Sequence, residues 1–308
     1  PYIKNKNILP LDKNEQKSLT SNIKALTIWK LSSLLVNNTD NIIITYFSGL
    51  ATVGISSNYT LLSNTLNSLL NQIFNGISAS VGNYNAIESN EKKIKLFNNI
   101  NLLNFWLFGW ATVGIIVLSG DIVKLCFGEN YVLPFNIPCI IGINFYMVGM
   151  QNAVWTYKNT MGLFRQGRYL LIVTAIFNLV FSILLGSEWG LFGIMLATSI
   201  SRLLTNTWYD PYVVFKYGLN TSPKIYLKKY IYFLILLIIT IIVSLYLCSF
   251  IEFNTILDII NKFIICIIIP NLIFLLAFYK KDEFKYFLEL LNKFKMLILH
   301  YIKLIKKY

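Results

Sequence analysis

The chain has 308 residues, of which 56% are hydrophobic and 13% are charged, about half the ~25% charged residues usual in soluble domains. This composition excludes a disordered chain and is unlike that of an ordinary soluble enzyme. A net charge of +13 would suit nucleic-acid binding, but the basic residues lie in loops and at the ends of apolar runs, so we expect no nucleic-acid partner. Eight mostly apolar stretches of roughly 20 residues predict an all-α integral membrane protein.

The eight expected transmembrane helices follow one another with short connections. In chain order, they are residues 25–46, 51–81, 99–119, 134–157, 169–186, 190–210, 229–250 and 260–279. Residues 231–248 are uncharged and apolar all round, which predicts that the seventh span faces lipid on most sides.

We expect four parts in the chain. They are a cytoplasmic N-terminal segment (1–24), a six-helix lobe (25–210), two further spans with their preceding loop (211–279) and a basic amphipathic cytoplasmic tail (280–308). The chain begins with Pro1 rather than Met, and its first 24 residues are polar and basic like an internal loop. We therefore expect it to be part of a longer protein.

The distribution of lysine and arginine orients the spans. Successive connections between spans lie on opposite sides of a membrane, so the second, fourth and sixth connections form a first set and the other connections form a second set. Of the 27 such residues, only Lys124 and Lys262 fall in the second set, and Lys30 and Arg202 fall within spans. The remainder lie in the N-terminal segment, in the first set of connections and in the tail. Because cytoplasmic loops carry the excess of basic residues, both ends of the chain are predicted to be cytoplasmic.

The tail has an apolar face at helical spacing. Its members are Phe284, Phe287, Leu288, Leu291, Phe294, Ile298, Ile302 and Ile305. With lysines on the other sides, this pattern predicts an amphipathic helix on the anionic cytoplasmic leaflet, with membrane lipid as its partner. Binding to a protein partner is the alternative.

Polar residues at spacings of three or four form a row along the second span. They are Ser57, Thr60, Asn64, Asn67, Asn71, Asn75 and Ser78. Such a row cannot face lipid tails, because its amides would lose their hydrogen-bond partners there. It therefore predicts the wall of a polar cavity, and the alternative is a set of hydrogen bonds between helices.

Three other spans add polar residues to the same predicted cavity. These candidates are Lys30, Asn37 and Asp40 in the first span, Asn144, Gln151, Trp155 and Asn159 in the fourth, and Arg202 and Asn206 in the sixth. Asp40 lies well inside its span, where a charge costs about 2.5–3.5 kcal/mol, so it is predicted to be functional. The alternative for Asp40 is a buried structural ion pair with Arg202.

The cavity chemistry favours one class of ligand. Amides donate and accept hydrogen bonds, and aromatic faces stack on sugar rings, so a large neutral or weakly anionic molecule such as an oligosaccharide is expected. Arg202 and Lys158 could bind a phosphate or an acidic sugar. The sequence contains no recognisable catalytic motif, and we predict no catalytic residue, metal or cofactor.

Three runs resemble a known family. NNTDNIIITYFSGLATVGISSNYTLL, LNSLLNQIFNGISASVGN and GLFRQGRYLLIVTAIFNLVFSILLGSEWGLFGIMLATSISRL are similar to Wzx-type polysaccharide (O-antigen or capsule repeat-unit) flippases. These belong to the multidrug/oligosaccharidyl-lipid/polysaccharide exporter superfamily. The similarity covers about residues 20–220.

The resemblance implies a two-lobed transporter in the bacterial cytoplasmic membrane. It would flip undecaprenyl-pyrophosphate-linked oligosaccharides by alternating access, and this chain would supply the second six-helix lobe and two C-terminal helices. The implied partners are the missing N-terminal lobe, the lipid-linked oligosaccharide and a glycan polymerase complex. The alternatives are an exporter of another lipid or a drug with the same fold, a membrane enzyme of glycan assembly, and a structural subunit.

Overall fold

The structure is a computed structural model that describes residues 12–250 and 255–289. It is all-helical, with no strand among these residues. The helices are α1 (Lys13–Ser48), α2 (Leu50–Ile87), α3 (Asn90–Phe127), η1 (Glu129–Tyr131), α4 (Asn136–Met150), α5 (Asn152–Thr160), α6 (Leu170–Leu204), α7 (Asn206–Val213), η2 (Val214–Gly218), α8 (Lys224–Cys248) and α9 (Thr255–Phe278). Each of the eight expected spans overlaps one or two of these helices, although some run a residue or two past a helix end.

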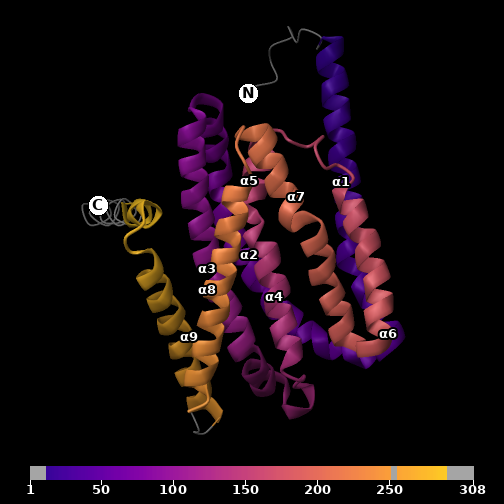
Figure 1. Cartoon of the computed structure of the whole chain (residues 1–308). Helices are drawn as coiled ribbons and strands as arrows, with labels where there is room; N and C mark the ends of the chain where they lie inside the picture. The colour runs from indigo at the N-terminus through magenta and orange to yellow at the C-terminus, as the bar shows by residue number, and fades with distance from the viewer. Residues whose placement is uncertain (1–11, 251–254, 290–308) are drawn as a thin grey trace, which may run out of the picture.

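The connections alternate between the two ends of the bundle (Figure 1). Those that precede α3, α6 and α8 lie at the end where α1 begins, and those that precede α2 and α4 lie at the opposite end. This is the alternation that the lysine and arginine pattern requires. The orientation of the two ends across a membrane stays a prediction.

α3 lies among α2, α4, α8 and α9 and buries much of its length against them. Phe105 stacks on Phe233 of α8, with ring centroids 4.4 Å apart, and contacts Phe274 of α9 at 4.8 Å. By contrast, only 28% of the apolar 18-residue stretch of α8 is buried in the structure. The exposed majority agrees with the lipid-facing surface expected for the seventh span.

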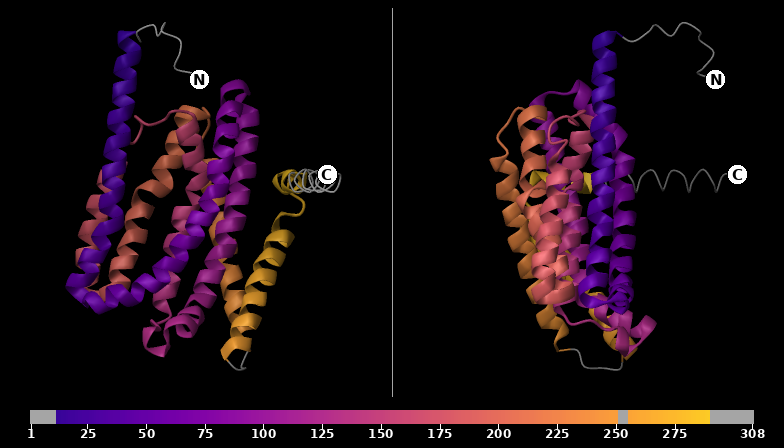
Figure 2. Two further views of the ribbon diagram at one scale, coloured as in Figure 1. Left: turned by 180° about the vertical axis from the view of Figure 1, so that it is seen from behind. Right: turned by 90° about the vertical axis from the view of Figure 1, so that its right-hand side faces the viewer.

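α1 begins well before the first expected span, so residues 13–24, whose composition resembles that of a loop, are helical. Whether this segment is cytoplasmic stays a prediction. A capping box starts the helix: the Asp12 side chain caps the first turn, and the Asp12 N–H donates to Glu15 Oε2 at 3.2 Å. These bonds satisfy amide groups that otherwise lack partners at a helix start. As a result, α1 extends beyond the other helices at this end (Figure 2). Residues 1–11 lie outside the described residues.

α6 is a helical hairpin rather than one straight helix. Gly190 interrupts it with φ 54° and ψ −133°. Asn178 Nδ2 donates to Thr198 Oγ1 at 3.0 Å, although a straight helix would separate residues 20 apart by roughly 30 Å. The two arms correspond to the fifth and sixth expected spans, and α7 continues the second arm after a break at Thr205.

The hairpin depends on close approach of its arms at Gly193. A Cβ atom there would overlap the backbone carbonyl oxygen of Leu185, which cannot move away as a flexible side chain could. We therefore expect Gly193→Ala to destabilise the protein by roughly 1–3 kcal/mol, measured by thermal unfolding in detergent. Gly114→Ala is the control, because no heavy atom lies within 4 Å of a Cβ at Gly114. Equal unfolding temperatures for the two variants would contradict this reading.

Five described stretches are long and apolar enough to cross a bilayer. They are Asn90–Phe127, Asn136–Thr160, Leu170–Gly218, Lys224–Cys248 and Ile256–Phe278. The chain is thus a multi-pass membrane protein. Two features explain why five stretches stand beside eight expected spans. Leu170–Gly218 is one stretch although it contains the α6 hairpin, and the polar residues of α1 and α2 lower the mean hydropathy of those helices. The total of eight transmembrane helices therefore stays a prediction.

The described part of the tail packs against the bundle. Residues 282–289 are helical, and Phe284 and Phe287 stack on Trp106 of α3, with ring centroids 5.6 and 6.1 Å away. Glu283 pairs with Lys229 of α8 at 2.9 Å. The first members of the predicted apolar face therefore contact protein rather than lipid. Leu288, the next member, is 44% exposed, and the members from Leu291 on lie outside the described residues.

Candidate ligand cavity

A polar cavity of about 640 Å³ opens between α1, α2, α4, α5 and α6. The lining residues are Asp40, Asn41 and Ile44 of α1, Ser56, Thr60, Ser63, Asn64 and Asn67 of α2, Ile141, Asn144, Phe145 and Val148 of α4, Trp155 of α5, and Leu171, Met195, Thr198 and Arg202 of α6. Thr60 of the predicted polar row and six further candidates from the sequence are among them, namely Asp40, Asn64, Asn67, Asn144, Trp155 and Arg202. This volume lies within the range of about 300–1,000 Å³ typical of ligand sites.

The polar row of α2 divides along its length. Asn64 and Asn67 line the cavity, whereas Asn71 donates to Asn67 Oδ1 at 3.1 Å and Asn75 is exposed. In the described part of the chain, the side-chain hydrogen bonds of this row stay within α2, which favours a cavity wall over bonding between helices. Because Asn64 is exposed as well as cavity-lining, the cavity is open on the α2 side.

Asp40 and Arg202 bring opposite charges to the cavity from α1 and α6. Asp40 Oδ2 accepts a hydrogen bond from Thr198 Oγ1 at 3.1 Å, and Asn178 in turn donates to Thr198. Asp40 Oδ1 and Arg202 Nε are buried without a hydrogen-bond partner. No ion pair within 4.0 Å joins the two side chains among the described residues. Each thus keeps bonding capacity for a third group.

Asn144 lines the cavity but uses its amide to join α4 to α6. Its Nδ2 donates to the Met195 carbonyl oxygen at 2.9 Å, and its Oδ1 accepts from Ser199 Oγ at 2.8 Å. Both ends of the amide are satisfied within the protein. Asn144 therefore shapes the wall more than it offers a free bonding group.

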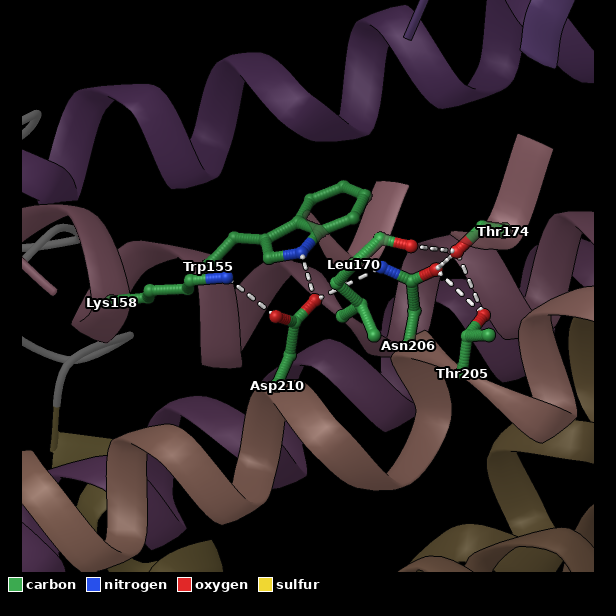
Figure 3. A network of polar contacts seen from close by, with 7 residues as sticks. All are labelled: Trp155, Lys158, Leu170, Thr174, Thr205, Asn206 and Asp210. Carbon is green, nitrogen blue, oxygen red and sulfur yellow. Dashed lines mark hydrogen bonds and ion pairs between the residues drawn. The ribbon is translucent and has the colours of Figure 1, made fainter. Parts of the chain in front are cut away.

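A buried network lies beside the cavity and includes a residue that the sequence reasoning missed. Asp210 of α7 is 1% exposed and accepts three hydrogen bonds (Figure 3). The donors are Lys158 Nζ at 2.5 Å to Oδ1, and Trp155 Nε1 and Asn206 Nδ2, each at 3.2 Å to Oδ2. Lys158, considered for phosphate binding from the sequence, is thus paired with Asp210.

The same network connects α7 back to α6. Thr174 Oγ1 lies 2.8 Å from both Asn206 Oδ1 and Thr205 Oγ1. The helix break at Thr205 is therefore bridged by side chains. Asp210 was not predicted from the sequence because it directly precedes Pro211 at the end of an expected span. A charged residue at that place is usually interpreted as part of the following loop. Its spacing of four from Asn206 was the available signal.

Lys30, Asn159 and Gln151 are not among the described residues that line the cavity. Lys30 and Asn159 are exposed, and the side chain of Asn37 is outside the described set. Gln151, at the break between α4 and α5, is 3% exposed, and neither its amide nitrogen nor its amide oxygen has a partner. The structure therefore brings together Asp40, Asn64, Asn67, Asn144, Trp155 and Arg202. Asn71 is bonded to Asn67, and Asn206 is linked to Trp155 through Asp210.

Comparisons with protein-family models, with curated proteins and with solved structures give no significant match. The class of this protein therefore rests on its own fold and cavity. Among the described residues, they define an all-helical, multi-pass membrane protein with a polar cavity that is lined by one acidic and one basic side chain, Asp40 and Arg202.

Proposed function

We propose that this chain is the second lobe of a transporter that flips undecaprenyl-pyrophosphate-linked oligosaccharides across the bacterial cytoplasmic membrane, with both ends of the chain cytoplasmic. The observation that carries the proposal is the open cavity, whose amides, hydroxyls and indole suit sugar and whose Arg202 suits a phosphate. A drug exporter is the second candidate, but a drug site would offer more apolar and aromatic lining.

The open side of the cavity supports a partner lobe. Asn64 and Asn75 lie on one face of α2, and both are exposed. Amides that face acyl chains each cost on the order of kcal/mol, so a second wall is needed in the membrane. In the proposed transporter, rocking of one lobe against the other opens the cavity to each side in turn.

Restoration of surface glycan tests this proposal. The 308-residue chain alone should fail to restore glycan to a flippase-deficient strain. Co-expression with a six-helix N-terminal lobe should restore both its membrane level and glycan export. Full recovery by the chain alone would contradict the need for a second lobe, and no recovery with the lobe at normal protein level would contradict the transport activity.

Thiol labelling of intact cells tests the orientation. Cys126 is exposed near the end predicted to lie outside, so it is first replaced by serine. Cysteines at Glu129 or Glu188 should then react with an impermeant reagent, whereas cysteines at Glu91 or Thr221 should react only after permeabilisation. The reverse pattern would show that the chain has the opposite orientation.

A further inference from the structure

The indole of Trp155 is held at the cavity wall by its polar edge. Trp155 lines the cavity, while its Nε1–H donates to Asp210 Oδ2 outside it. In Figure 3 the N–H edge faces the carboxylate and the six-membered ring extends away from it. The apolar part of the side chain is therefore the part available to a ligand.

Asp210 is itself fixed, so it determines the direction of the ring. Lys158 binds its other oxygen at 2.5 Å, and Asn206 shares the oxygen that Trp155 uses. Trp155 and Lys158 lie on neighbouring turns of α5, while Asn206 and Asp210 lie on α7. The carboxylate thus joins two short helices and leaves the indole one preferred orientation.

The surroundings of this ring are unusual for an aromatic side chain in a core. The cavity also presents amides and hydroxyls from α2, including Thr60, Asn64 and Asn67. A pyranose ring has an apolar face of C–H groups that stacks on an aromatic face, and a rim of hydroxyls that need hydrogen bonds. An aromatic face within a polar wall offers both.

We propose that Trp155 is the stacking platform for a sugar ring in the cavity, and that Asp210 is the positioning residue that orients it. This inference rests on the proposed function, which it deepens by naming one subsite. The ligand class is a neutral pyranose, bound without help from the lipid or the phosphates.

The test is equilibrium binding of radiolabelled N,N′-diacetylchitobiose to the chain together with the six-helix partner lobe in lipid nanodiscs. This disaccharide carries neither lipid nor phosphate, so it reports on the sugar contact alone. Trp155→Leu should weaken binding about 3- to 10-fold, and Trp155→Phe should weaken it less than Trp155→Leu, because phenylalanine keeps an aromatic face but loses the N–H that Asp210 orients. The control is Trp208→Leu, because Trp208 is 48% exposed, is not among the cavity-lining residues, and donates to the Leu204 carbonyl oxygen at the end of α6.

A double-mutant cycle separates positioning from a merely structural role. Asp210→Asn should weaken binding in the native background but not in the Trp155→Phe background, since phenylalanine has no N–H to orient. An equal effect in both backgrounds would overturn the role of Asp210. Absence of binding by the native chain, or unchanged binding by Trp155→Leu, would overturn the subsite. Either result would leave glycan recovery, which tests the transport proposal, as a separate outcome.

Discussion

Replacement of Asp210 by alanine is expected to destabilise the protein by about 3–5 kcal/mol, the largest stability effect predicted here. The change leaves Lys158, whose side chain is 13% exposed, as a buried charge without its partner. It also removes the acceptor for Trp155 and for Asn206. Thermal unfolding in detergent measures the effect.

Two further variants separate a buried pair from ion pairs in general. Glu88→Ala breaks the Lys92–Glu88 pair on the surface, where the lysine side chain is 61% exposed, and should cost about 0–1 kcal/mol. The double change Lys158→Met and Asp210→Leu removes both charges and should recover much of the loss. If Asp210→Ala were no more damaging than Glu88→Ala, the network would not be a structural element.

Spacing along single helices made much of the cavity predictable. The amide row of α2 follows from residues three and four apart, and Asp40 stood out as a charge within a span. The α6 hairpin was visible as two apolar runs separated by a few residues around Gly190. In each case the information lies within a short segment, where helical periodicity determines which side chains share a face.

Partners far apart in the sequence were not predictable. Lys158 and Asp210 are 52 residues apart, so no local pattern revealed that one neutralises the other. The bond from Thr198 to Asp40 spans 158 residues. The start of α1 was missed for another reason: residues 13–24 are polar, but Asp12 and Glu15 cap them as a helix.

Asp40→Asn in the complete transporter is expected to abolish glycan export while leaving its level in the membrane near normal. Among the described residues that line the cavity, Asp40 is the one carboxylate. Asparagine has nearly the same shape and still accepts the hydrogen bond from Thr198, so the fold should persist. What disappears is the negative charge opposite Arg202.

Asp121→Asn is the matched control for that variant. Asp121 pairs with Lys262 at 2.7 Å, away from the cavity lining, so the same chemical change there should leave export intact. Normal export by Asp40→Asn would assign Asp40 a structural role. Loss of export that follows loss of protein would do the same.

Direct measurement of flipping tests the central claim most closely. Vesicles would contain the chain with a six-helix partner lobe and a fluorescent undecaprenyl-pyrophosphate-linked oligosaccharide, and an impermeant quencher would follow arrival of the sugar at the outer leaflet. The account predicts quenching faster than in empty vesicles for the native cavity, and a rate equal to that of empty vesicles for Asp40→Asn. Native vesicles that quench no faster than empty ones would contradict it.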